Sequence, residues 1–152
     1  MNPISTTESR PTLRGEQVMH FRLHHIGFVV RSISEQINGF AESIRAQWDG
    51  QMFKDPLQEA RVSFLKPEVD GEPLMELVEP LSENSPLIKF LERGGGLHHL
   101  CYEVTDLEAA LALARQKGGV VVKRPQPAVA FAGRRIAWVA TPHRLLIEYL
   151  EK

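Results

Sequence analysis

Residues 23–30 read LHHIGFVV, and the same pattern returns 74 positions later, where residues 97–104 read LHHLCYEV. Both copies share Leu-His-His, followed by an aliphatic residue, an aromatic residue and a final valine at matching places. Each copy precedes a segment with helical periodicity, about 32–43 in the first half and 106–117 in the second. A duplication constrains architecture more than any single propensity, so the chain is predicted to contain one structural unit twice.

Each half also closes on a similar strand, LMELVE at 74–79 and LIEYLE at 146–151. Shorter runs with strand character lie between the helix and the closing strand, at 61–65, 119–122 and 135–140. The repeated unit is therefore a strand, a helix and three strands. We predict an α+β fold in which two tandem βαβββ units, about 22–80 and 96–151, form a curved mixed sheet around a metal-binding cleft. A linker helix at about 82–93 is expected to join them.

Composition is typical of a soluble protein of one domain. The chain has 152 residues, of which 43% are hydrophobic and 24% charged, and its formal net charge of -1 argues against a nucleic-acid partner. No apolar run approaches the roughly 18 residues that would cross a bilayer. The single cysteine, Cys101, and the lack of a signal peptide favour the cytoplasm. Residues 1–20 show no apolar period and are expected to form a flexible arm before a single domain at 21–152.

Strand alternation separates the two histidines of each pair. Successive side chains of a strand point to opposite faces, so His25 faces away from Phe28, which belongs to the helix-covered side. By the same count His99 points into the cleft. His24 and His98, the first histidine of each pair, are then predicted to face the helices.

Glutamates on the two closing strands complete a set of four ligand-type side chains on one face. The set is His25, Glu76, His99 and Glu148. Imidazole nitrogens and carboxylate oxygens suit one divalent ion of the cobalt, nickel, zinc or manganese kind, and two of each leave a neutral site with open positions. We therefore predict a catalytic metal centre that polarises a bound carbonyl and stabilises an enolate.

These residues carry a resemblance to the vicinal oxygen chelate superfamily, which includes glyoxalase I, extradiol dioxygenases and bleomycin-resistance proteins. The resemblance covers residues 22–151. Within it, the linker EPLSENSPLIKFLER at 79–93 and the GLHH that follows at 96–99 resemble methylmalonyl-CoA epimerases. This implies an epimerase or isomerase that exchanges the acidic proton of a methylmalonyl-CoA-like acyl thioester, with the four-residue set as its metal ligands. Relatives commonly pair, which implies a homodimer.

The resemblance also implies which groups move the proton. Inversion of a stereocentre needs two acid/base groups, and Glu76 and Glu148 lie on opposite sides of the predicted ion. Some epimerases carry a glutamate base where this chain has Val62, so Glu76, Glu148 and the nearby Glu59 remain the alternatives.

Other residues are candidates for substrate binding. Arg134 and Arg135 beside a glycine are predicted to bind a carboxylate or a CoA phosphate, and Gln58 has a weaker claim. Two other functions stay open: a glyoxalase-I-like lactoylglutathione lyase, which would use the same four ligands, and a non-catalytic small-molecule-binding protein of the resistance type.

Overall fold

Two βαβββ units follow one another along the chain, as the duplication predicts. In this computed structural model, which describes residues 19–152, the first unit comprises β1 (Phe21–Val29), α1 (Ile33–Ile44), β2 (Ala46–Trp48), β3 (Phe53–Asp55), β4 (Ala60–Pro67) and β5 (Leu74–Pro80). The second comprises β6 (Gly96–Val104), α3 (Leu107–Gln116), β7 (Val120–Pro127), a 3-10 turn η1 (Val129–Phe131), β8 (Arg135–Ala140) and β9 (Leu146–Glu151). Apart from residues 19 and 20, the expected N-terminal arm lies outside the described residues.

Strands β2 and β3 act as one interrupted strand of the first unit. Both pair antiparallel with β4, β2 at its C-terminal end and β3 at its N-terminal end. The break between them is a turn in which the Asp49 side chain accepts the backbone N–H of Gln51 at 2.9 Å. With this interruption the first unit keeps the order of strand, helix and three strands.

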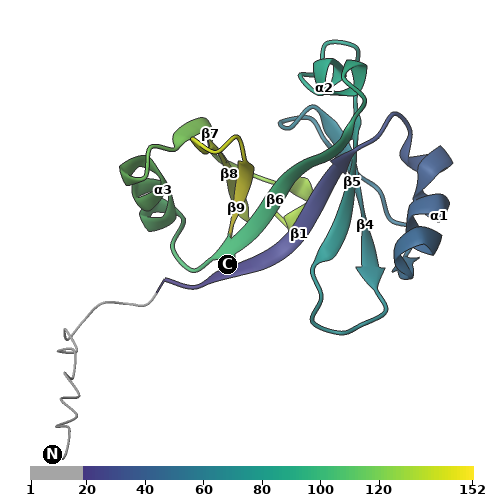
Figure 1. The fold of residues 1–152 in the computed structure, drawn as a ribbon, viewed down its shortest axis with the longest axis horizontal. Helices are drawn as coiled ribbons and strands as arrows, with labels where there is room; N and C mark the ends of the chain where they lie inside the picture. Colours follow the sequence, from purple (N-terminus) through teal and green to yellow (C-terminus); the bar gives the residue numbers. More distant parts are fainter. Residues whose placement is uncertain (1–18) are drawn as a thin grey trace, which may run out of the picture.

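One mixed sheet contains all the strands of the described chain. Its order is β2-β4-β5-β1-β6-β9-β8-β7, with β3 beside β4. β1 pairs parallel with β5, β6 pairs parallel with β9, and β1 and β6 join the halves as an antiparallel pair. Figure 1 shows β1 and β6 side by side in the centre, with α1 and α3 at opposite ends of the molecule. The two halves are therefore related by an approximate twofold axis between β1 and β6.

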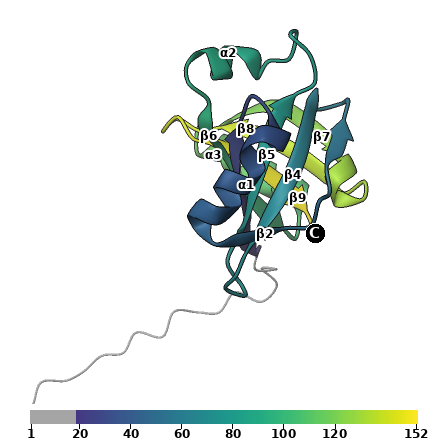
Figure 2. The same cartoon turned by 90° about the vertical axis from the view of Figure 1, so that its right-hand side faces the viewer.

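Both helices cover the same side of this sheet with a narrow apolar face. In α1, Ile33 and Ile37 are fully buried four positions apart and pack against β4 and β5 (Figure 2). In α3, Leu107 and Leu111 have the same spacing and pack on the second half of the sheet. The opposite face of the sheet is left to line a cleft.

The helix starts agree with the sequence, but the linker helix is shorter than predicted. Ser32 and Asp106 are the N-caps of α1 and α3, and each side chain accepts a backbone N–H from the first turn. Linker helix α2 spans only Ile88–Glu92, whereas 82–87 form turns. Pro86 explains the difference, because proline has no N–H to donate and disfavours a helical conformation in the residue before it. None of the helices within 19–152 is long and apolar enough to cross a membrane.

Candidate metal centre

The four central strands each bring one ligand-type side chain to the same point. His25 comes from β1, Glu76 from β5, His99 from β6 and Glu148 from β9, and each is at most 4% exposed. In the first half, Phe28 and Met75 pack on the α1 side instead, as strand alternation predicts for His25 and Glu76. We call His25, Glu76, His99 and Glu148 the four-residue cluster.

Polar atoms of this cluster converge within contact distance. Nε2 of His25 lies 3.1 Å from Nε2 of His99. Oε2 of Glu76 lies 3.3 Å from the His25 Nε2 and 3.1 Å from the His99 Nε2. Glu148 stands slightly apart, with its two oxygens each 3.9 Å from one imidazole nitrogen. Both halves of the duplication therefore contribute equally to one centre.

A glycine makes room for one of the two imidazoles. Gly27 pairs with His99 across the β1–β6 ladder, and a Cβ at Gly27 would overlap the His99 ring. In the other half, His25 pairs with Cys101, a fully buried thiol. Each inner ring thus lies over a small residue of the neighbouring strand.

His24 and His98 do not face the helices, so that prediction was wrong. Nδ1 of His24 lies 2.9 Å from Nδ1 of His25, and Nδ1 of His98 lies 3.0 Å from Nδ1 of His99. The reason is a pair of register shifts in the β1–β6 ladder, one at each His-His pair. Such a β-bulge inserts an extra residue, which breaks the alternation and turns its side chain toward the site.

We call His24 and His98 the outer histidines, and His25 and His99 the inner ones. Burial, reinforced by the adjacent inner ring, lowers the pKa of each outer histidine from 6.5 to about 4. Both outer rings are therefore neutral at pH 7, and each can accept a hydrogen bond.

The two carboxyl groups of the cluster differ in electrostatic environment. Burial alone would raise the pKa of Glu76, but hydrogen bonds and charge from the inner histidines lower it below its ordinary value. Burial raises the pKa of Glu148, which has no comparably close partner. Among the described residues, Oε1 of Glu148 is a buried oxygen without a hydrogen-bond partner. Such an atom is costly unless something binds it.

The arrangement fits a divalent ion. His25, His99 and Glu148 each offer one ligand atom close enough to share an ion, and Glu76 contacts both imidazole nitrogens. An ion among them would bind the unpartnered Glu148 oxygen and neutralise both carboxylate charges. The inner rings present Nε2 to the centre and hydrogen-bond at Nδ1, which is the usual arrangement of metal-bound histidine.

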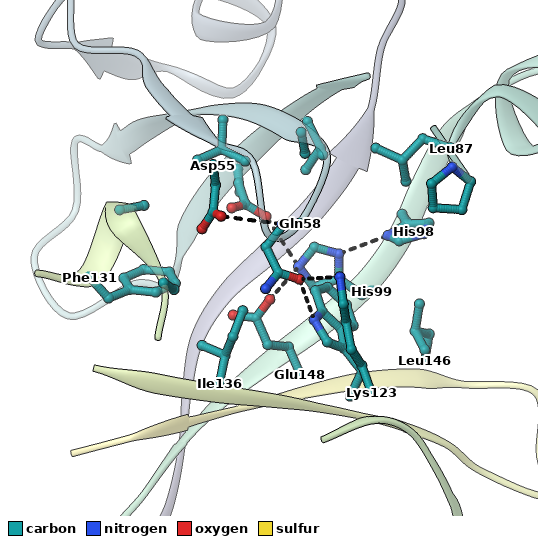
Figure 3. A pocket seen from close by; sticks show the side chains of 18 of the residues that line it. Asp55, Gln58, Leu87, His98, His99, Lys123, Phe131, Ile136, Leu146 and Glu148 are labelled. Carbon is teal, nitrogen blue, oxygen red and sulfur yellow. Dashed lines mark hydrogen bonds and ion pairs between the residues drawn. The ribbon is translucent and has the colours of Figure 1, made fainter. Parts of the chain in front are cut away.

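A cavity of about 400 Å³ opens beside the cluster (Figure 3). Glu76, His99 and Glu148 lie in its wall, which is otherwise mainly apolar and includes Val62 and Ile136. A volume of this size suits a small organic ligand. The cavity therefore places a ligand directly against the cluster.

Gln58 and Lys123 are further polar residues that line this cavity (Figure 3). Gln58 Oε1 accepts from Lys123 Nζ at 3.1 Å and from Trp138 Nε1 at 3.3 Å. Gln58 Nε2 is buried and has no partner among residues 19–152. Sequence reasoning named Gln58 but missed Lys123, because the two are 65 positions apart and no motif links them.

The two predicted arginines are placed elsewhere. Arg134 Nη1 donates to Glu103 at 2.8 Å, and Arg135 donates to both Glu151 oxygens, at 2.6 and 2.8 Å. Neither lines the cavity beside the cluster, although Arg134 borders a second hollow behind Phe131. The structure therefore does not bring them to the four-residue cluster.

The remaining candidates for the catalytic base differ in whether they line the cavity and carry a carboxylate. Val62 lines the cavity with an apolar side chain and is 8% exposed. Glu59 lies on an exposed turn and does not line the cavity. Within residues 19–152, only Glu76 and Glu148 are carboxylates that both line the cavity and contact the inner histidines.

Fold and cluster together define a class of protein: paired βαβββ units whose central strands supply two histidines and two glutamates to one cleft. The family model described as the glyoxalase/bleomycin resistance protein/dioxygenase superfamily matches residues 24–138. The chain belongs to that superfamily, and the resemblance read from the sequence is confirmed.

Several curated relatives of similar sequence are epimerases. The chain is 37% identical over 67 residues to an ethylmalonyl-CoA/methylmalonyl-CoA epimerase of Cereibacter sphaeroides, a match that covers 43% of this chain and 50% of that protein. It is 32% identical over 98 residues to the mitochondrial methylmalonyl-CoA epimerase of Homo sapiens, covering 63% and 53%. The chain thus spans about half the length of the curated relatives it matches.

Solved structures that resemble this chain cover a larger share of it than the curated relatives do. A methylmalonyl-CoA epimerase of Mycobacterium tuberculosis has a TM-score of 0.71 at 27% identity, covering 86% of this chain and 87% of that one. One from Streptomyces coelicolor, in complex with 2-nitronate-propionyl-CoA, has a TM-score of 0.72 at 25% identity, covering 86% and 96%. A hypothetical protein of Bacillus halodurans has a TM-score of 0.74 at 32% identity, covering 87% and 94%. The fold is therefore shared with methylmalonyl-CoA epimerases.

Proposed function

We propose that this protein is a metal-dependent epimerase of methylmalonyl-CoA or a similar acyl-CoA thioester. The observation that carries the proposal is the convergence of His25, Glu76, His99 and Glu148 beside a largely apolar cavity. The similarity to methylmalonyl-CoA epimerases in sequence and in structure supports the substrate class.

A divalent ion bound by the cluster supplies a Lewis acid that favours negative charge on a carbonyl oxygen of the ligand. The chain's own task is to hold the thioester in place and to move the proton beside its carbonyl. Glu148 is the better placed base, because its oxygens lie 3.9 Å from the inner histidines, whereas a Glu76 oxygen lies within 3.3 Å of both, and because the Glu148 side chain lines the cavity. Glu76 contacts both inner histidines. It comes from β5, which lies on the opposite side of the β1–β6 pair from the β9 strand of Glu148, and it serves as the second acid/base group.

Lys123 and Gln58 also line the cavity and orient the ligand there. The lysine ammonium already donates to the Leu57 carbonyl at 2.8 Å and to Gln58 at 3.1 Å, so its position is fixed. Its remaining N–H and the unpartnered Gln58 Nε2 are donors that suit an oxygen-rich group of the ligand. The mainly apolar lining of the cavity helps to exclude water from the reacting carbon.

Proton exchange tests this function directly. The protein, loaded in turn with cobalt, nickel, zinc or manganese, is incubated with methylmalonyl-CoA in deuterated water. Deuterium should enter the carbon between thioester and carboxylate, and the stereoisomers should interconvert. If no ion supports exchange, the epimerase proposal is wrong. Consumption of the methylglyoxal–glutathione hemithioacetal would instead support a lyase of the glyoxalase I type, and ligand binding without turnover would support a resistance-type binder.

A homodimer in the cytoplasm is part of the same proposal. Support for pairing comes from β7, an edge strand of the sheet whose Val120 and Val122 are 62% and 55% exposed. Light scattering of the purified protein should give twice the monomer mass. A monomer at micromolar concentration would contradict it.

A further inference from the structure

Each inner histidine is hydrogen-bonded at Nδ1 to the histidine that precedes it. The Nδ1–Nδ1 distances are 2.9 Å for His24 and His25 and 3.0 Å for His98 and His99. A neutral imidazole carries one N–H, so in each pair one ring donates and the other accepts. This bond therefore decides which nitrogen of the inner ring keeps a lone pair.

The nitrogen that carries the proton in each inner ring determines whether donors or acceptors face the centre of the cluster. The two inner Nε2 atoms are 3.1 Å apart, and Glu76 Oε2 lies within 3.3 Å of both. If the inner rings carry their proton on Nδ1, three acceptor atoms face one another, and a cation among them removes the repulsion. If they carry it on Nε2, both rings donate to Glu76 and no inner-ring lone pair is left for an ion, while Oε1 of Glu148 still lacks a partner.

We infer that His24 and His98 are positioning residues that accept the Nδ1–H of His25 and His99 and so direct an Nε2 lone pair of each inner ring toward a divalent ion. The inference rests on the proposed metal centre and adds the residues that prepare it. A metal-binding histidine needs a partner for its other ring nitrogen, because that partner fixes both tautomer and orientation.

Aromatic side chains hold the outer rings in this orientation. The His24 ring packs edge-on against Phe131, with centroids 5.4 Å apart. The His98 ring packs against Phe90 at 4.9 Å and Trp138 at 6.1 Å (Figure 3 shows His98 beside His99). Within the described chain, the inner Nδ1 atom is the only hydrogen-bond partner of either outer ring. The hydrogen bond of each outer ring is therefore made to its inner neighbour.

The β-bulges give this arrangement a structural origin. Between Leu23 and His25, β1 advances two residues while β6 advances one, which makes His24 the extra residue. Between His99 and Leu97, β6 advances two while β1 advances one, which makes His98 the extra residue. Both bulges fall at the same place in the repeat and turn an outer ring toward its inner neighbour.

Nitrogen NMR of the metal-free protein tests the tautomer. With ¹⁵N-labelled histidine, His25 and His99 should each show a protonated Nδ1 and an unprotonated Nε2. In His24→Phe, which keeps the ring shape and removes the acceptor, the His25 signal should lose this single-tautomer pattern while His99 keeps it. Wild-type inner rings protonated at Nε2 would overturn the inference, whatever the protein does with metal.

Metal competition against a chromophoric chelator gives the second readout. The dissociation constant for zinc should rise about 10- to 100-fold in His24→Phe and in His98→Phe. His24→Asn places an acceptor oxygen where Nδ1 was and should recover much of the loss. His143→Phe, in an exposed turn, is the matched control and should bind zinc like the wild type.

The outcomes separate the two proposals. If the wild type binds no divalent ion, the metal centre fails, and the NMR pattern still decides the tautomer. If the wild type binds zinc and both phenylalanine variants bind it equally well, the positioning role is wrong although the centre stands. If circular dichroism shows that one phenylalanine variant is unfolded, zinc affinity is compared in His24→Asn and in the phenylalanine variant of the other half of the repeat.

Discussion

Small residues opposite the inner histidines are as necessary to the centre as the histidines themselves. Gly27 and Cys101 occupy equivalent places in the two halves, two positions after an inner histidine, and each lies across the ladder from the inner histidine of the other half. Cys101 is held as a thiol, because burial and the nearby Glu148 raise its pKa. It acts as a small packing residue and not as a nucleophile.

Gly27→Ala should displace the His99 ring, because the added methyl group would overlap the imidazole. We expect a loss of about 1–3 kcal/mol in the free energy of unfolding, together with weaker metal binding. Urea denaturation and chelator competition measure the two effects.

Gly39→Ala is the matched control for that substitution. Gly39 lies in α1, and apart from its chain neighbours and the nearby backbone of the helix, no described atom lies within 4 Å of the place that an added methyl group would take. Alanine should therefore stabilise the helix by about 0.5–1 kcal/mol. Equal effects at the two glycines would contradict the packing argument at Gly27.

Glu148→Gln should abolish proton exchange and weaken metal binding more than the outer-histidine variants do. The amide keeps the size of the side chain but removes the charge and the basic oxygen that faces the cavity. Zinc affinity and deuterium incorporation are measured beside Glu92→Gln, an exposed glutamate at the end of α2. Unchanged zinc affinity in Glu148→Gln would refute its role as a ligand.

At the scale of elements, α1 and α3 stabilise the sheet that carries the four-residue cluster. They start at equivalent caps and press apolar residues on the side of the sheet opposite the cluster. The strands that carry the ligands are thereby fixed on one face, while their other face stays free to line the cavity.

The two caps differ in geometry, which leads to a ranking of stability. Asp106 accepts the Ala109 N–H at 2.9 Å, whereas Ser32 accepts the Glu35 N–H at 3.4 Å. Asp106→Ala should cost about 1 kcal/mol of unfolding free energy, and Ser32→Ala should cost less. Urea midpoints of the two variants decide the order, and a larger loss in Ser32→Ala would contradict it.

At the scale of the whole molecule, the centre joins the two halves of the duplication. β1 and β5 belong to the first unit, β6 and β9 to the second, and each strand supplies one residue of the cluster. An ion bound there would link four strands across the approximate twofold axis.

Adding zinc or cobalt should therefore raise the melting temperature and slow amide exchange in all four strands together. At a free ion concentration 100 times the dissociation constant, the stabilisation is about 2.7 kcal/mol. Magnesium, which prefers oxygen ligands, is the control and should have little effect. Protection confined to one half of the sheet would contradict a shared centre.

The sequence by itself determined the duplication, the approximate starts of the two main helices and the positions of the four-residue cluster. These depend on local periodicity and on a repeat that places the matching histidines 74 positions apart and the matching glutamates 72 positions apart. Because the period of a strand is two, the inner histidines and both glutamates could be assigned to one face without coordinates.

Only the tertiary structure decided the rest. The outer histidines turn toward the site because of bulges, and a bulge is a property of pairing between two strands that no single strand reveals. Likewise Lys123 meets Gln58 from 65 positions away, while Arg135 is bound by Glu151 on the adjacent strand. Which side chains a long polar residue meets depends on contacts distant in sequence, and these form only when the sheet has closed around its cavity.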